Sequence, residues 1–110
     1  MRLAEAVLGD LATRPLEVYA QTRGAFDLVV NCASVPGTEM SSILSVREGG
    51  EVLFFSMATS FTAAALGAEG VGKDVQLIIG NGYAKGHARL ALDLVRATPA
   101  LQRIFAARVA

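Results

Sequence analysis

The sequence contains no tryptophan, one cysteine and one histidine among its 110 residues. Because Cys32 is alone, it cannot form a disulfide within the chain. Together with His87, it cannot supply the three or four ligands of an ordinary zinc site. We therefore expect no metal site.

Excess charge and long apolar runs are also missing. Ten basic and ten acidic residues give a net charge of zero and form no run of like sign, so nothing attracts a nucleic-acid backbone or an anionic membrane. The apolar runs at Leu28–Val30 and Val52–Phe55 are far shorter than the roughly 20 residues that span a bilayer. The start lacks the pattern of a signal peptide. We expect a cytoplasmic protein that binds neither nucleic acid nor a membrane.

What remains is the composition of one globular domain, with 53% hydrophobic residues and no low-complexity tract. We expect residues 1–110 to form this domain around one core, with residues 1–24 as a helical lead-in. Apolar residues at helical spacing predict a first helix from Arg2 to Leu11, and Thr13 before Pro15 predicts the start of a second.

Three apolar, β-branched runs predict strands, namely FDLVVNCA (26–33), EVLFFSM (51–57) and DVQLII (74–79). The first is expected to be buried on both faces. Helical patterns lie between them at 38–46 and 59–68, and two more follow Gly82 and begin at Pro99. Parallel neighbours need such crossovers. The sequence thus predicts an α/β fold of three layers, with a parallel sheet of about three strands.

Two glycine-rich motifs suggest nucleotide binding. GAEGVGK (67–73) has P-loop spacing, but Asp74 replaces the required hydroxyl residue and the motif precedes a strand instead of following one. We reject it. Gly80, Gly82 and Gly86 follow a strand and open a helix, where backbone can approach a ligand. The array is one residue too long for the dinucleotide fingerprint. A secondary cofactor contact or a tight turn explains it better than a pyrophosphate site.

Neither Cys32 nor His87 has a neighbour in sequence that would make it catalytic. Cys32 is interpreted as a small buried hydrophobe and His87 as a surface or hydrogen-bonding residue. The glutamates, including Glu39, are scattered and are interpreted as solvated charges. The best candidate site is the rim at the carboxyl ends of the strands, where open parallel sheets bind ligands. Its polar residues are Asn31, Ser34, Ser56, Thr59 and Asn81.

Two segments, FDLVVNCASVPGTEM and GGEVLFFSMATSFTAAALGAEGVGKDVQLIIGNGYAKGHA, resemble the carboxyl-terminal part of the L-erythro-3,5-diaminohexanoate dehydrogenase family, from about Thr13 onward. The resemblance implies the second half of a Rossmann-like coenzyme domain of medium-chain dehydrogenase type. It also implies NAD-dependent oxidative deamination of a diamino acid to 5-amino-3-oxohexanoate in lysine fermentation. The residues that choose NAD over NADP, and the catalytic residues, have no counterpart here.

By the same resemblance, the ends of the three strands line the nicotinamide half of the cofactor. The implied contacts are Asn31, Cys32, Ala33, Ser56, Met57, Ala58, Gly80, Asn81 and Gly82. Without the first half of the coenzyme domain, the edge at Phe26–Ala33 is unpaired. We expect a homo-oligomer, joined at this edge or at Asp74–Ile79, or a complementing amino-terminal half. The alternative is a non-catalytic half-Rossmann module that dimerises.

Overall fold

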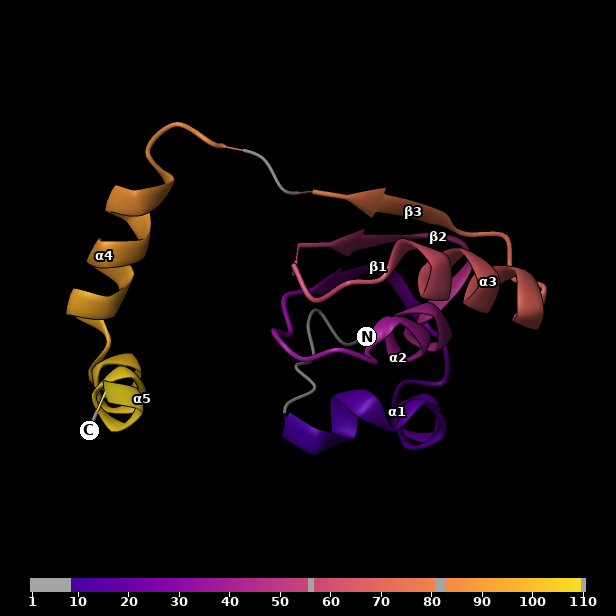
Figure 1. Ribbon diagram of the computed structural model, residues 1–110, viewed down its shortest axis with the longest axis horizontal. Coiled ribbons are helices and arrows are strands. Elements are labelled where there is room, and N and C mark those ends of the chain that lie inside the picture. The colour runs from indigo at the N-terminus through magenta and orange to yellow at the C-terminus, as the bar shows by residue number, and fades with distance from the viewer. Residues whose placement is uncertain (1–8, 56, 81–82, 110) are drawn as a thin grey trace.

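The computed structural model describes residues 9–55, 57–80 and 83–109 (Figure 1). Three strands alternate with helices, which confirms the α/β class. The elements in chain order are the 3-10 helix η1 (Gly9–Thr13), α1 (Pro15–Thr22), β1 (Phe26–Asn31), α2 (Glu39–Ser45), β2 (Val46–Phe54), α3 (Phe61–Val71), β3 (Gln76–Ile79), α4 (His87–Ala97) and α5 (Pro99–Val109). Within these ranges no helix is long and apolar enough to cross a membrane.

The strands form one parallel sheet in the order β1-β2-β3. Helices α2 and α3 are the two crossovers, as the sequence predicts. Both crossovers step in the same direction across the sheet, and right-handed connections of this kind place their helices on the same face. Figure 1 shows the three arrows pointing the same way, so the carboxyl ends of the strands share one edge.

The core lies between β2 and the crossover helices. Val52 and Phe54 on β2 are buried against Ala64 of α3. Helix α1 forms an outer layer on α2, with Val18 and Thr22 buried and the Thr22 hydroxyl 3.5 Å from Ser45 Oγ. Sheet, crossover helices and α1 are thus stacked in that order.

The opposite face of the sheet is exposed. The register aligns Leu28 with Glu51 and Gln76, and Val30 with Leu53 and Ile78. Since side chains alternate along a strand, this face, which we call the open face, consists of those two rows and Phe55. Leu28 and Val30 are 54% and 50% exposed. The prediction that the first strand is buried on both faces is wrong, because no described helix covers this one.

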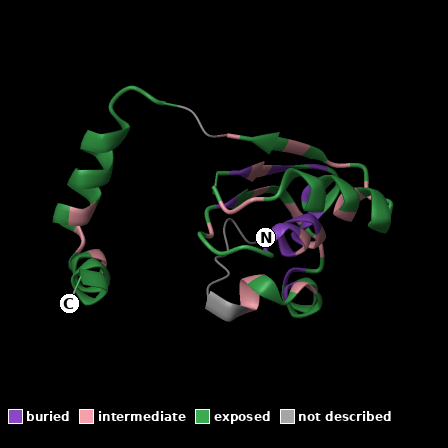
Figure 2. Ribbon diagram, viewed as in Figure 1, coloured by how far each residue is buried: buried purple, intermediate pink, exposed green. Residues whose placement is uncertain are grey.

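Helices α4 and α5 stand apart from the sheet (Figure 1). They have no buried residue, and Figure 2 shows them exposed along nearly their whole length. We call residues 83–109 the arm. The helical pattern after Gly82 predicts an apolar stripe that faces inward and consists of Ala88, Ala91, Leu92, Leu94 and Val95, yet no residue of α4 is buried in the structure.

Strand β1 ends at Asn31 instead of Ala33, and β2 ends at Phe54 instead of Met57. Two other differences from the predicted boundaries occur at glycines. Strand β2 begins at Val46, five residues before the predicted Glu51, because the chain between them joins β1 through a register irregularity. Gly49 provides the positive φ of 77° that this bulge requires. Gly50 lies so close to the backbone that a Cβ there would be 2.9 Å from the Asp27 carbonyl oxygen.

Helix α3 passes its predicted end at residue 68, and Gly70 does not interrupt it. The helix continues past Ala68 to Val71 and ends at Gly72, whose φ is 65°. Gly67 is where α3 crosses α2, since a Cβ there would collide with Met40. Packing therefore requires a residue that local propensity disfavours.

The predicted helix starts are only partly met. Residue 14, and not Thr13, precedes the first turn of α1. The predicted helix at residues 2–11 falls mostly outside the described residues.

Candidate functional site

The candidate site is the rim formed by the loops that leave the carboxyl ends of the strands. The backbone ladder extends one step past β2 and β3, since Phe55 N donates to Asn31 O (2.9 Å) and Gly80 N to Phe54 O (3.0 Å). These bonds hold the starts of all three loops side by side. The predicted contacts therefore come from neighbouring segments. Of these contacts, Ser56, Asn81 and Gly82 lie outside the described residues.

Asn31 holds the loop after β1 in place. Its Nδ2 donates to Thr38 Oγ1 and Ser42 Oγ, both at 2.9 Å, and its Oδ1 accepts from Ala33 N at 3.0 Å. The side chain is buried and its amide is fully engaged. Asn31 thus shapes the rim, and any ligand contact from this strand falls to its neighbours, of which Cys32 is exposed and Ala33 half-buried. The interpretation of Cys32 as a buried hydrophobe is wrong, because the chain has already left the core at Asn31.

The loop after β2 contains the site's one buried polar atom that lacks a hydrogen-bond partner within the described part of the chain, Thr59 Oγ1. Leaving a buried hydroxyl unsatisfied costs about 1–3 kcal/mol. Such an atom marks a position where a ligand polar group would be stabilised. The neighbouring predicted contacts differ in exposure, with Met57 exposed and Ala58 half-buried.

Glu39 is buried and contacts the backbone of Ser60, which sequence reasoning missed. Its Oε2 accepts from Ser60 N at 3.1 Å and so joins the start of α2 to the start of α3. The Ser60 hydroxyl in turn accepts from Ala63 N at 3.2 Å as the cap of α3. The interpretation of Glu39 as a solvated charge is therefore wrong. Its place in the first turn of a predicted helix, where acidic residues are stabilised, was the available signal.

Lys73 confirms that GAEGVGK is not a phosphate loop. Its Nζ donates to Val46 O (2.6 Å) and Ile43 O (2.9 Å), where it caps the carboxyl end of α2. This position is at the amino ends of the strands, opposite the rim. Desolvation by burial lowers the pKa of Lys73 below its ordinary value, although the nearby Glu48 carboxylate acts in the other direction.

His87 and Cys32 belong to different parts of the molecule. His87 opens α4 on the arm, with Nδ1 2.7 Å from Ala84 O and its ring edge-on to Tyr83. No contact joins it to Cys32 among the described residues. Gly86, with a φ of 84°, precedes α4 as its cap residue, so this member of the glycine array serves a turn. The described residues contain no group of three or more potential metal ligands.

Two curated proteins match nearly the whole chain. The chain is 51% identical to L-erythro-3,5-diaminohexanoate dehydrogenase of Acetoanaerobium sticklandii over an alignment of 110 positions, which covers 96% of this chain and 32% of that protein. It is 50% identical to the same enzyme of Fusobacterium nucleatum over 104 residues, 90% of this chain and 30% of that one. The predicted resemblance is confirmed.

The chain therefore spans about a third of the length of the dehydrogenases that it matches. Coverage of 96% leaves only a few residues unmatched, so the resemblance starts well before the expected Thr13. No family model matches the chain.

Proposed function

We propose that this chain is part of a nicotinamide-dependent dehydrogenase and supplies the nicotinamide side of its cofactor site. Identity of about one half to two named dehydrogenases over at least 90% of the chain carries the proposal. A parallel sheet with helical crossovers, as found here, is the architecture on which such cofactors bind at the carboxyl ends of strands.

The rim fits the polar edge of a nicotinamide. Thr59 offers a buried hydroxyl without a partner in the described residues, and Cys32, Ala33, Met57, Ala58 and Gly80 bring backbone to the same edge. When bound, the cofactor accepts a hydride from the substrate. The residues of this chain bind and orient the ring, and the exposed Phe55 lies at the rim end of the open face.

By analogy with the two relatives, the substrate is a small diamino acid, L-erythro-3,5-diaminohexanoate, and the reaction is its oxidative deamination in lysine fermentation. We propose NAD as the cofactor and the cytoplasm as the location. Residues 1–110 would act as one coenzyme half-domain, as a homo-oligomer or beside a complementing amino-terminal half. The exposed open face also favours a second candidate, a non-catalytic module that dimerises.

A titration of NADH into the purified chain tests the proposal. The protein lacks tryptophan, so the cofactor's own emission can be followed without energy transfer from an indole. We expect saturable binding that is lost in Gly80→Val, because a Cβ there would lie 3.2 Å from Leu53 Cδ1 and 3.8 Å from the Phe55 ring, so the added side chain would displace the start of the loop after β3. Gly70→Val is the matched control, since a Cβ there meets nothing within 4 Å. Equal affinity in the two variants, or no binding at millimolar NADH, would favour the non-catalytic module.

A further inference from the structure

The chain exposes more surface than a compact protein of its mass. Its accessible area is 7773 Å², whereas surface-to-mass scaling for 11.5 kDa gives roughly 5,800 Å². Its radius of gyration is 15.2 Å, against about 13 Å for a compact domain of this length. The excess area is on the order of 2,000 Å², and the open face and the arm are among the exposed surfaces of the described residues.

The open face is apolar toward the rim, while Glu51 and Gln76 lie beside Leu28 in its other row. Leu28, Val30 and Ile78 are 54%, 50% and 37% exposed and lie in adjacent register with the half-buried Leu53. Phe55, at the rim end, is 50% exposed. Contiguous apolar patches of this extent mark interaction sites in folded proteins.

The arm presents the matching surface. The charged side chains of α4 share one side, where Asp93 lies within 4.0 Å of both Arg89 and Arg96. Leu90 and Leu94 lie one turn apart on another side, 61% and 53% exposed. An amphipathic helix with no buried residue has its apolar side available for a partner.

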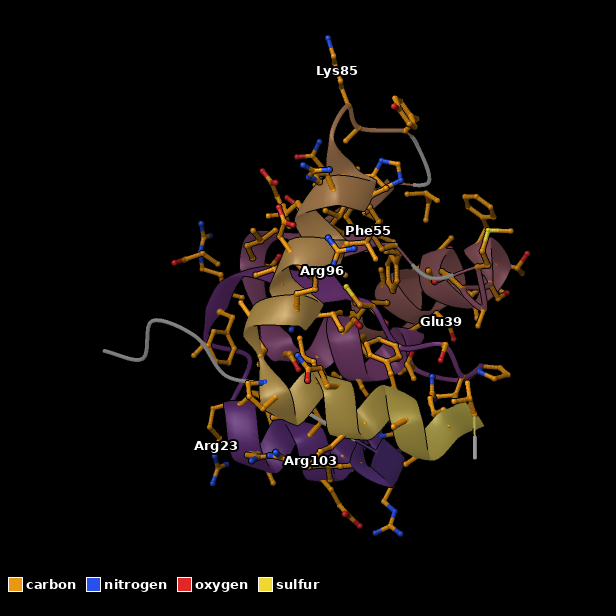
Figure 3. All side chains as sticks on the ribbon, turned by 90° about the vertical axis from the view of Figure 1, so that its left-hand side faces the viewer. Arg23, Glu39, Phe55, Lys85, Arg96 and Arg103 are labelled. Atoms are coloured by element: carbon orange, nitrogen blue, oxygen red, sulfur yellow. The ribbon has the colours of Figure 1, made fainter. Side chains whose placement is uncertain are left out.

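Charge complements this fit. Residues 83–109 contain five basic side chains and one acidic side chain, whereas residues 9–80 contain four basic and eight acidic ones. The arm therefore has a formal charge of +4 and the remainder −4. Figure 3 shows Lys85 projecting outward before α4, and Arg96 and Arg103 on the two arm helices. Opposite charges of this size favour docking of the arm on the α/β body.

We propose that the arm of one copy covers the open face of a second copy, in a symmetric dimer with exchanged arms. The arm extends away from its own sheet (Figure 1), and covering its own open face would require it to turn back over the β3 edge. Exchange between copies needs no such reversal and is a low-barrier route to dimers. If the contact removed the excess area of both chains, the dimer would bury at most about 4,000 Å², and specific interfaces need only about 1,200–2,000 Å².

Cross-linking between differently tagged copies tests the exchange. In a Cys32→Ser background, one copy carries Val30→Cys on the open face and the other Leu94→Cys on α4, and a short bis-maleimide joins cysteines that lie close together. We expect a cross-linked heterodimer. Leu66→Cys is the control, because Leu66 is 61% exposed on α3 at the opposite face, and it should not join Leu94→Cys.

Mass measurement gives an independent readout. Light scattering at micromolar concentration should give twice the chain mass, and Leu90→Asp with Leu94→Asp should weaken association at least about 100-fold, because two carboxylates would be buried against apolar side chains. Leu66→Asp should remain dimeric. A monomeric parent chain, a dimer unaffected by the paired substitutions, or cross-linking only within one chain carrying both cysteines would overturn the proposal.

Discussion

Replacing Thr59 by valine tests whether the rim is built to receive a ligand. Valine has nearly the shape of threonine but lacks the hydroxyl, whose oxygen is buried without a partner in the described residues. In the free protein, this hydroxyl carries a desolvation penalty of about 1–3 kcal/mol that valine does not. Thr59→Val should therefore stabilise the free chain by about 1 kcal/mol, which corresponds to a rise in Tm of roughly 4–8 °C for a domain of this length.

The same substitution should weaken cofactor binding. A net hydrogen bond is worth about 0.5–1.5 kcal/mol, so the Kd for NADH should rise roughly 2- to 12-fold, following the tenfold change per 1.4 kcal/mol. Thermal unfolding and the NADH emission titration measure the two effects. Thr59→Ser keeps the hydroxyl and should bind NADH like the parent chain.

The two measurements together distinguish a binding role from an internal one. If the hydroxyl bonded within the protein, Thr59→Val would lower the Tm and leave the NADH affinity unchanged. That result would refute the assignment of Thr59 to the site.

Three further predictions concern the body of the fold. Gly50→Ala should destabilise the chain by about 1–3 kcal/mol in urea unfolding, because its Cβ would press on the Asp27 carbonyl oxygen. Gly70→Ala is the control and should stabilise the chain by up to about 1 kcal/mol, because a Cβ at this position on α3 lies in open space. Equal effects of the two substitutions would contradict the close approach at Gly50. Asn31→Ala should cost about 2–3 kcal/mol in the same assay, since it removes two buried hydrogen bonds and one part-buried one, and an unchanged midpoint would show that the loop keeps its structure without Asn31. The lowered pKa of Lys73 means that the folded chain binds fewer protons than the unfolded chain just below pH 10.5, so the free energy of unfolding should rise with pH there. Lys73→Met should flatten this rise. If the parent chain and Lys73→Met gave the same slope of unfolding free energy against pH, the result would argue against burial of the amine.

The sequence predicts the sheet better than it predicts the burial of the sheet. Runs of β-branched residues identify β1, β2 and β3, because such residues fit a pleated surface that is at least half-buried. The assumption that β1 is buried on both faces fails at Leu28 and Val30. Apolar character reports what a face is suited to contact, and only tertiary structure shows whether a partner is there.

The candidate site was also predictable only in part, because its location follows from the sequence and the roles of its side chains do not. The rim follows from the order of strands and loops alone, which the sequence supplies. The roles of individual side chains do not, since Asn31 is engaged by Thr38 and Ser42, and Glu39 by Ser60, through contacts that join separate elements. Spacing along the chain cannot reveal such pairs. The rejection of GAEGVGK as a phosphate loop succeeds, because it depends only on the position of the motif before a strand.

The open face follows from topology more than from residue choice. Two right-handed crossovers that step in one direction must place α2 and α3 on the same side, so residues 9–80 cannot cover the other side with their own crossover helices. Apolar residues at Leu28, Val30 and Ile78 would then be a liability unless a further element regularly covers them. The arm, with its unburied apolar side and opposite charge, is the element of this chain suited to that contact, and because its path leads away from its own sheet, the contact calls for a second copy.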